Sequence, residues 1–294
     1  MVNGASVSNH QAAAHVNNGE VAFFSSSFDG KVVYAYKFQL RDNPLTRWVE
    51  VWCDTTTGEV VQAINFSNKA SYKVVALPHR DPTDGFSGLT RHPMKKPTRK
   101  IWTNGKATEG NNVIALTPSN KTIRSAGNGV FYTKFNSKED PGSAANIVAA
   151  AVNLFYITNM VHDISYQYGF TESAGNFQKN NFGLGGEGND AVIINVLNPS
   201  DTNNAEFFTF PDGQPGVMNM FRFTKTTPHR NPGLDNGVII HEYTHGISNR
   251  LTGGPATASC LNTLEAAGLD EGWSDIIAMI SWPRVPTLPP PKSL

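Results

Sequence analysis

Residues 235–251 read DNGVIIHEYTHGISNRL, and this segment decides how the rest of the chain is interpreted. Its apolar residues recur at helical spacing, which predicts a helix over about 234–250. His241 and His245 are four residues apart, so on a helix the two imidazoles lie on one face. Two imidazoles in this arrangement can bind one zinc ion, and Glu242 then lies near the open coordination position of the metal.

The surroundings of the two histidines favour a buried site over a solvent-exposed polar face, which is the structural alternative. The pair is flanked by four apolar residues, Val238, Ile239, Ile240 and Ile247. Burying two histidines and a glutamate without a partner costs several kcal/mol. A bound metal ion offsets this cost, so we expect the pair to ligate zinc.

A catalytic zinc site needs a third protein ligand and keeps its fourth position for water. Glu265, Asp270, Glu271 and Asp275 are the downstream candidates. Glu271 is our choice because it opens a predicted helix over 270–281. Asp275 lies one turn later on the same face and can accept the free N–H of a zinc-bound histidine. We interpret Asp270 as a negative residue that suits the helix N-terminus, and Glu265 as a local cap or pair.

Composition excludes several classes of function. The 294 residues carry 24 basic and 24 acidic side chains, so the net charge is zero and nucleic acid or an anionic membrane is not an expected partner. No apolar run reaches the ~18–20 residues of a membrane helix. With 39% hydrophobic residues the chain can bury a sizeable core. Its two cysteines, Cys53 and Cys260, cannot form a disulfide framework.

The order of predicted elements indicates an α+β fold, because strands precede helices. Residues 20–66 alternate like strands around a turn at 54–58 and predict a small antiparallel sheet. Residues 67–135 are rich in loops, and two further strands are expected over 191–196 and 216–224. After Pro141 a helix is predicted by apolar spacing, at Ile147, Ala151, Leu154, Phe155, Thr158, Val161 and Ile164.

Several long stretches carry a more specific signal. They are HDISYQYGF (162–170), GNFQKNNFG (175–183), GGEGNDAVIIN (185–195), TNNAEF (202–207), PDGQPGVMNM (211–220), LDNGVIIHEYTHGISNRLTGGPA (234–256) and EGWSD (271–275). Over about residues 70–280 the chain resembles the fungalysin family of secreted fungal zinc metallopeptidases, relatives of thermolysin. The resemblance implies a thermolysin-like zincin lobe with an active-site helix.

The resemblance also implies roles for individual residues. His241, His245 and Glu271 would bind one zinc ion per chain, Glu242 would be the general base, and Asp275 would orient a ligand from outside the metal shell. The implied reaction is endopeptidic hydrolysis of peptide bonds in protein substrates.

Asn204 and Ala205 resemble an edge strand that pairs with the substrate backbone, although Asn203 and Asn204 also suit a turn. The adjacent His162 and Asp163 are not expected to face each other on a helix. We therefore interpret them, with Tyr166, as packing and hydrogen-bonding residues. The histidines without ligand spacing are expected in surface or loop roles: His10, His15, His79, His92 and His229.

By the same resemblance, we predict three regions: a propeptide remnant (1–69), a catalytic domain (70–281) and a Pro-rich tail outside the family pattern (282–294). The propeptide would inhibit the enzyme intramolecularly, which makes the protein a zymogen, and would be cleaved near 68–71. The tail is either a linker or recognition segment, or the end of an incomplete gene product. The expected protein is a secreted monomer; its calcium requirement stays open.

Two departures from the family leave a second hypothesis open. Residues 1–15 lack the features of a secretory signal, so either the protein is not exported or this chain lacks its true beginning. The family pattern stops near Met279, and the helical C-terminal lobe, which would stabilise the oxyanion, is largely missing. The alternative is therefore a fragment that binds zinc but is catalytically incomplete.

Overall fold

The computed structural model describes residues 20–25, 32–41, 48–65, 70–90, 102–103, 105–126 and 129–281. The predicted tail over 282–294 and the N-terminal stretch over 1–15 lie outside the described residues. Backbone contacts divide the chain into two units, Met1–Lys69 and Ala70–Leu294. The two units are described separately below.

The N-terminal unit contains the small antiparallel sheet that the alternating pattern predicts. Its strand order follows the chain: β1 (Glu20–Ser25), β2 (Val32–Arg41), β3 (Trp48–Asp54) and β4 (Val60–Asn65). The predicted turn after β3 is confirmed. Asp54 accepts hydrogen bonds from the backbone N–H groups of Thr56 (2.7 Å) and Thr57 (2.9 Å), while Gly58 takes the positive φ that closes the turn.

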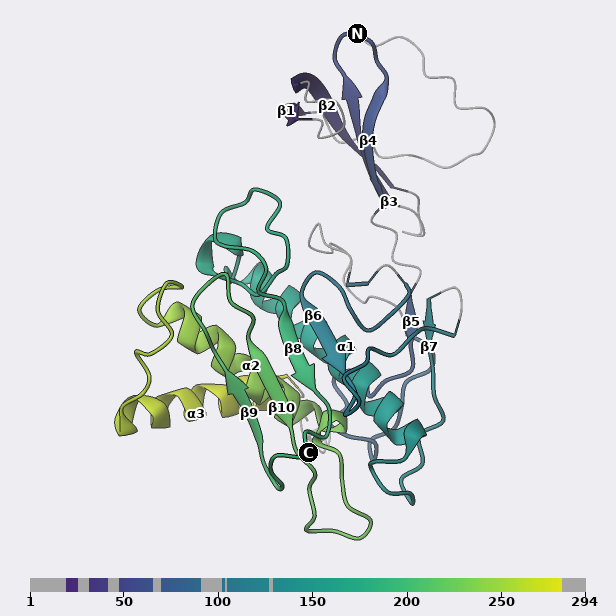
Figure 1. Ribbon diagram of the computed structural model, residues 1–294, viewed down its shortest axis with the longest axis vertical. Helices are drawn as coiled ribbons and strands as arrows, with labels where there is room; N and C mark the ends of the chain where they lie inside the picture. The colour runs from purple at the N-terminus through teal and green to yellow at the C-terminus, as the bar shows by residue number, and fades with distance from the viewer. Residues whose placement is uncertain are drawn as a thin grey trace, which may run out of the picture. The chain divides into compact units, whose positions relative to one another are not determined.

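The second unit is built on a mixed four-stranded sheet in the order β6-β8-β10-β9 (Figure 1). Strands β6 (Val113–Leu116), β8 (Val192–Asn195) and β10 (Val217–Met220) run parallel, and β9 (Ala205–Phe208) is antiparallel to β10 at the edge. A two-stranded sheet, β5 (Ser71–Tyr72) with β7 (Val130–Phe131), lies in the loop-rich region. The predicted α+β class is confirmed.

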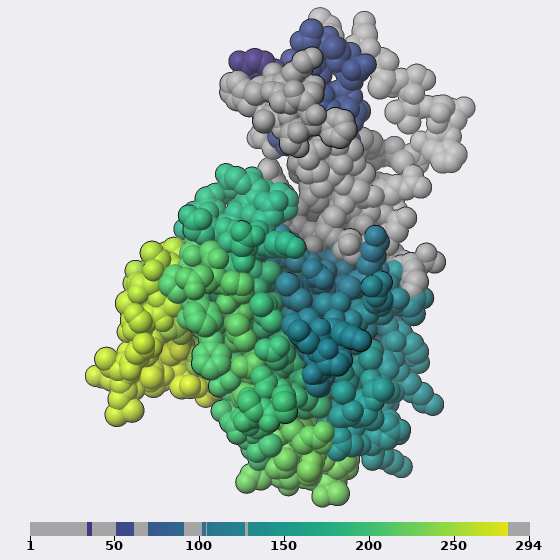
Figure 2. Space-filling view, in the orientation of Figure 1, coloured from purple at the N-terminus to yellow at the C-terminus, as the bar shows by residue number. Residues whose placement is uncertain are grey.

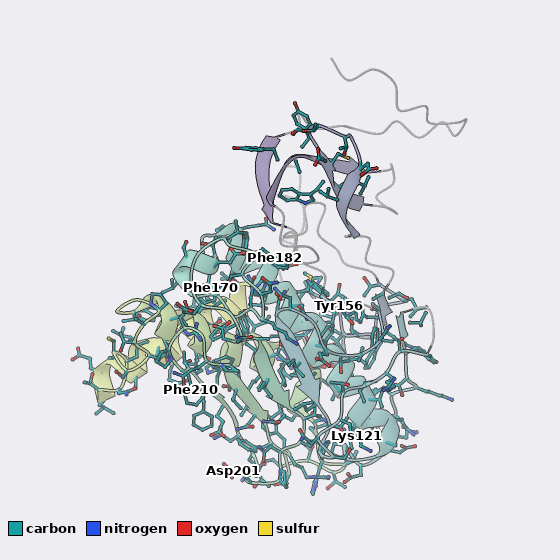
Figure 3. The ribbon with its side chains drawn as sticks, turned by 45° about the horizontal axis from the view of Figure 1, so that its top comes forward. Lys121, Tyr156, Phe170, Phe182, Asp201 and Phe210 are labelled. Carbon is teal, nitrogen blue, oxygen red and sulfur yellow. The ribbon has the colours of Figure 1, made fainter. Side chains whose placement is uncertain are left out.

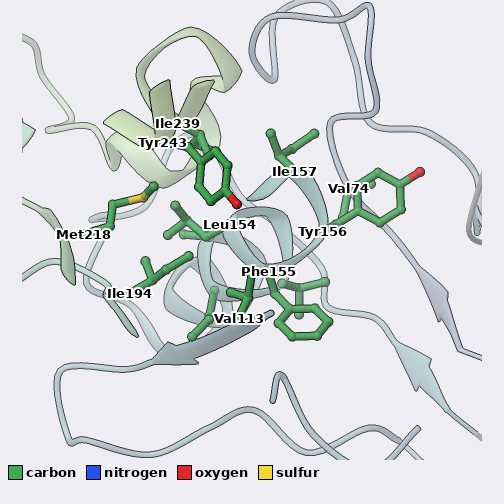
Figure 4. Close-up of a cluster of buried hydrophobic side chains, with 14 of the residues drawn as sticks. Val74, Val113, Leu154, Phe155, Tyr156, Ile157, Ile194, Met218, Ile239 and Tyr243 are labelled. Carbon is green, nitrogen blue, oxygen red and sulfur yellow. The ribbon is translucent and has the colours of Figure 1, made fainter. Parts of the chain in front are cut away.

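Helix α1 (Ala144–Gln167) forms the centre of the core. Figure 4 shows Leu154 and Ile157 among side chains from the sheet, such as Ile194, and from α2, such as Tyr243. By length and by the mean hydropathy of an 18-residue window (1.5) α1 could cross a membrane, but 78% of that window is buried, which is typical of a core helix. The helix predicted from apolar spacing is confirmed, and of the residues in that pattern Ile164 is 37% exposed.

Two further helices carry the candidate site. Helix α2 (Asn236–Leu251) follows the short 3₁₀ helix η2 (Pro232–Leu234), and Asp235 caps it by accepting from the Gly237 N–H at 2.9 Å. Helix α3 (Leu264–Ile280) begins at Thr263, whose hydroxyl accepts from the Ala266 N–H. The predicted start at residue 270 is therefore wrong by about two turns. Another 3₁₀ helix, η1 (Glu172–Ala174), follows α1.

A buried pair of asparagines fixes the N-terminus of α2. The amide of Asn153, on α1, contacts Asn236 at 3.0 Å and accepts from the Val75 N–H at 2.9 Å. Asn236 in turn donates to the carbonyls of Val75 (2.7 Å) and His79 (2.8 Å). These bonds join α1, α2 and the segment after β5, so the helix with the His-Glu-x-x-His pattern starts from a rigid position.

Candidate metal centre

Helix α2 presents its two histidines to one side because its other sides are buried. Tyr243 is fully buried, and its ring lies against those of Phe177 and Phe207. At Gly246 a β-carbon would approach both phenylalanine rings to 2.8 Å, so only glycine permits this close packing. The side chain of His241 is 21% exposed, and the side chain of His245 is 13% exposed.

Three donor atoms converge beside α2. The Nε2 atoms of His241 and His245 lie 3.1 Å apart. Glu271 Oε2, from α3, is 3.1 Å from the first of these nitrogens and 3.7 Å from the second. The three residues predicted as metal ligands therefore form one cluster.

Each imidazole has a carboxylate on its far nitrogen. His241 Nδ1 is 2.9 Å from Asp275 Oδ1, the contact that helical spacing predicted. His245 Nδ1 is 2.8 Å from Asp270 Oδ2, and Asp270 also accepts from Ser248 and Asn249. The interpretation of Asp270 as a first-turn residue is wrong, because α3 begins six residues earlier. Glu271 likewise lies in the middle of α3 and does not open it.

The donor set fits a zinc ion. In the tautomer that directs each Nδ1–H at a carboxylate, both Nε2 atoms keep a lone pair, and a cation bound between these two atoms, which lie 3.1 Å apart, would satisfy both lone pairs. Donor atoms bound to tetrahedral zinc at about 2.0–2.1 Å are separated by about 3.4 Å. The three distances, 3.1, 3.1 and 3.7 Å, scatter around that value.

The pKa values at the centre follow from burial and from these contacts. Burial raises the pKa of Glu242 to about 7; the charges of Glu271 and Glu206 add to this rise, and His245 opposes it. Burial lowers the pKa of His245, but the hydrogen bond and charge of Asp270 outweigh burial, so the net shift is upward. A bound dication would lower the pKa of Glu242 by favouring its carboxylate form.

A cleft of about 530 Å³ adjoins the cluster. His241 and Glu242 line it together with Asn204 and Ala205, the residues predicted to contact substrate. Asn203 also lines the cleft, in a left-handed conformation (φ 59°), with its amide bonded to Thr224. It therefore behaves as the turn residue of the alternative interpretation.

The edge strand β9 offers backbone groups to this cleft. Strand β9 runs between the labelled Asp201 and Phe210 in Figure 3. The N–H of Phe221 donates to the carbonyl of Asn204 at 3.2 Å. Because bonded and non-bonded residues alternate in an antiparallel ladder, Ala205 and Phe207 direct their N–H and C=O groups to the free edge.

Sequence reasoning missed a buried charge cluster at the C-terminal end of α2. Arg250 is fully buried and donates to Asp190 (3.0 Å), Asp212 (3.1 Å) and several carbonyls, with its guanidinium 4.4 Å from the Phe177 ring centroid. The arginine ties the 175–190 and 210–214 segments to α2. Nothing in the local pattern indicates these partners.

The expectation for His162 and Asp163 needs one correction. Their side chains do meet, with His162 Nδ1 3.1 Å from Asp163 Oδ1. Asp163 also accepts from the Trp102 indole at 2.9 Å. Both residues are buried, and their hydrogen-bonding role is confirmed.

Comparison with known protein families identifies the family of this chain. The profile of the fungalysin metallopeptidases (M36) matches residues 71–285, which is most of the chain. The chain belongs to the fungalysin family. The resemblance predicted from the motifs is therefore confirmed, and membership of a metallopeptidase family implies a metal ion.

Curated relatives of this fungalysin come from several fungi. It is 40% identical to extracellular metalloproteinase 5 of Trichophyton tonsurans over 85% of the chain and 43% of the relative. It is 40% identical to extracellular metalloproteinase mep of Aspergillus fumigatus over 85% of the chain and 41% of the relative. Extracellular metalloproteinase 1 of Phaeosphaeria nodorum is 37% identical over 85% and 43%. The chain thus spans about two fifths of the length of these relatives.

Proposed function

We propose that this chain carries the metal-binding part of a zinc endopeptidase site. The observation that supports this most strongly is the convergence of His241, His245 and Glu271, with a carboxylate on the far nitrogen of each histidine. In this proposal the three residues hold one zinc ion. When bound, zinc supplies a Lewis acid that lowers the pKa of water and polarises a carbonyl group.

Glu242 would act as the general base. Its carboxylate lies in the cleft beside His241, and burial brings its pKa to about 7 in the absence of metal. A base with such a pKa can take a proton from water and return it to the leaving amine nitrogen near neutral pH. Asp270 and Asp275 would hold the imidazoles in the tautomer that keeps Nε2 free for the metal.

The backbone edge at Ala205 and Phe207 would bind an extended peptide. Pairing by β-strand addition uses backbone groups that every peptide has, which suits an endopeptidase with protein substrates. The zero net charge of the chain is compatible with such a substrate.

We further propose that the protein is secreted, in line with the names of its relatives. In this proposal residues 1–69 are a propeptide that occupies the cleft until it is cleaved, and the protein acts as a monomer.

The second candidate is a zinc-binding fragment without activity. The exposed face of α3 favours it. Leu269, Trp273 and Ile276 are 52%, 41% and 57% exposed, and Figure 2 shows α3, in yellow, along one side of its unit. Apolar side chains exposed along one helix face are typical of a face that packs against another part of a protein, and a site that needs such a part for catalysis would bind zinc without it.

Casein hydrolysis by the full, zinc-loaded chain separates the two candidates. The proposal expects hydrolysis after a lag, during which residues 1–69 are removed, and loss of hydrolysis in Glu242→Gln. A folded, zinc-loaded chain that never cleaves casein would support the inactive fragment. Unchanged zinc affinity in Glu271→Ala would remove Glu271 from the ligand set under both candidates.

A further inference from the structure

A row of polar side chains crosses the mixed sheet and ends at Glu206 on the edge strand β9. Asn219 Nδ2 donates to Glu206 Oε1 at 2.8 Å, and Asn219 is only 8% exposed. The Oδ1 of Asn219 accepts from the amides of Asn195 (2.8 Å) and Asn198 (2.9 Å). The strand register sets Asn195, Asn219 and Glu206 directly opposite one another. The amides therefore hold one carboxylate at a fixed place on the edge of the sheet.

The Glu206 carboxylate keeps acceptor capacity for a further partner. An ionised carboxylate has about four lone-pair positions, and the Asn219 bond uses one of them. Within the ranges that the structure describes, the ion pairs involve other carboxylates, and none joins Glu206 to an arginine, lysine or histidine. Its side chain is only partly buried. A charged group is thus held in place, partly open and without a counter-charge.

Glu206 lies on β9 beside the place where a peptide would bind at the edge of the cleft. Ala205, the preceding residue, lines the cleft with His241 and Glu242. Because Ala205 and Phe207 offer their backbone groups to the edge, a peptide that pairs antiparallel with β9 forms hydrogen-bonded pairs at these two residues. The peptide residue between them then faces Glu206 in a non-hydrogen-bonded pair, in which side chains are closest and Cα atoms are about 4.5 Å apart.

The side chains of that pair share one face of the sheet. Phe207 packs toward α2, against Tyr243, so Glu206 and the peptide residue opposite it point to the other face. A lysine or arginine there reaches the carboxylate as a cross-strand charge pair. An aspartate or glutamate would meet a like charge.

We propose that Glu206 is a specificity-determining residue that favours a lysine or arginine in the substrate at the residue opposite it. This inference rests on the proposed peptidase function. It adds a charge preference to an edge that otherwise contacts only the substrate backbone.

A purely structural role for Glu206 predicts a different result from Glu206→Gln. The glutamine Oε1 can accept the same hydrogen bond from Asn219, so the sheet keeps its polar row while the charge is removed. Glu109→Gln is the matched control. Glu109 is exposed and bridges to Ile114 on β6, at the opposite edge of the same sheet.

The test compares peptides that carry either lysine or norleucine at one residue, with this residue moved stepwise along the peptide. The full, zinc-loaded chain is assayed after its lag. We expect lysine to raise kcat/KM by up to about fivefold over norleucine at one residue, the upper end of the range for a cross-strand charge pair. The preference should shrink as salt is added. It should vanish in Glu206→Gln and persist in Glu109→Gln.

Equal lysine-to-norleucine ratios in the unaltered chain and in Glu206→Gln, at every residue, would overturn the inference while leaving the proposed function intact. Absence of all hydrolysis contradicts the proposed function instead. The inference is then decided by equilibrium binding of the same peptides to the Glu242→Gln chain. Any competition from residues 1–69 would weaken the binding of both peptides by the same factor. Equal affinities for the lysine and norleucine peptides would therefore overturn the inference about Glu206.

Discussion

The Nδ1 atom of His245 lies 2.8 Å from Oδ2 of Asp270, the residue that directly precedes Glu271 in α3. One turn further on, Asp275 makes the corresponding contact with His241 at 2.9 Å. A single helix therefore supplies the third donor of the cluster and both carboxylates that orient the imidazoles. The register of α3 against α2 sets the whole centre.

Removing either orienting carboxylate should weaken zinc binding. We expect Asp270→Asn and Asp275→Asn each to lower zinc affinity by about 10–100-fold. The loss should be larger for Asp270, whose side chain is 10% exposed, than for Asp275, which is 71% exposed. Competition with a zinc chelator measures both affinities, with Asp201→Asn as a surface control. Equal affinities in all four proteins would refute the orienting role.

Glu242→Gln should separate chemistry from metal binding. Loss of the general base should lower kcat by about 10²–10⁴-fold, because glutamine cannot take a proton from water. Zinc affinity should stay within a few-fold, since Glu242 is not among the three converging donors. Peptide hydrolysis and chelator competition give the two numbers, with Glu265→Gln on α3 as the control. A variant that keeps more than about a tenth of the activity is incompatible with this role.

Arg250 should matter for stability more than for chemistry. Arg250→Leu leaves Asp190 and Asp212 without their buried partner, and breaking such a pair costs about 3–5 kcal/mol of the free energy of unfolding. Arg222→Leu, which breaks the half-exposed pair with Asp140, should cost at most about 1 kcal/mol. Urea unfolding followed by tryptophan fluorescence compares the two. Similar losses in both variants would contradict the account of the buried cluster.

The cap of α2 should give the protein a pH-dependent stability. Burial raises the pKa of Asp235 above its ordinary value, so the folded state holds this proton more tightly than the unfolded chain. The stability from Asp235 is then complete below the ordinary carboxyl pKa and declines as pH rises through the raised value. Asp235→Asn keeps a capping oxygen without the charge. It should match the unaltered protein at low pH and become the more stable of the two as pH rises.

The difference in stability between Asp235→Asn and the unaltered protein is measured by denaturant unfolding in the presence of a chelator, at several pH values between 4 and 8. Asp235→Ala, which also loses the cap, should be about 1 kcal/mol less stable than the unaltered protein at the low-pH end. A difference between Asp235→Asn and the unaltered protein that does not grow with pH would exclude the proposed linkage.

The histidine pair of the ligand cluster could be predicted from the sequence because its geometry is local, whereas Glu271 was assigned through the resemblance to the family. His241 and His245 meet through helical spacing alone, and the four-residue step from Glu271 to Asp275 likewise needs only a helix. The start of α3 was missed because the prediction began at the acidic residues. The capping Thr263 and the helix-forming Leu264, Glu265 and Ala266 were the available signal.

The partners of Asp270 and Arg250 could not be predicted in this way. Asp270 meets His245 only because α3 packs on α2 in one register, and spacing within a single helix does not contain that information. Arg250 donates hydrogen bonds to oxygen atoms of the 175–190 and 210–214 segments, which approach it only in the folded chain. The row of polar side chains that ends at Glu206 similarly depends on the register of three strands.

The central claim is that His241, His245 and Glu271 form one zinc site. The most direct measurement is the zinc content of the full chain after equilibration with zinc and dialysis, with X-ray absorption to identify the ligand atoms. The account predicts about one zinc ion per chain bound only by nitrogen and oxygen, and its loss in the His241→Ala/His245→Ala double variant. A folded chain that retains no more zinc than this double variant would contradict it.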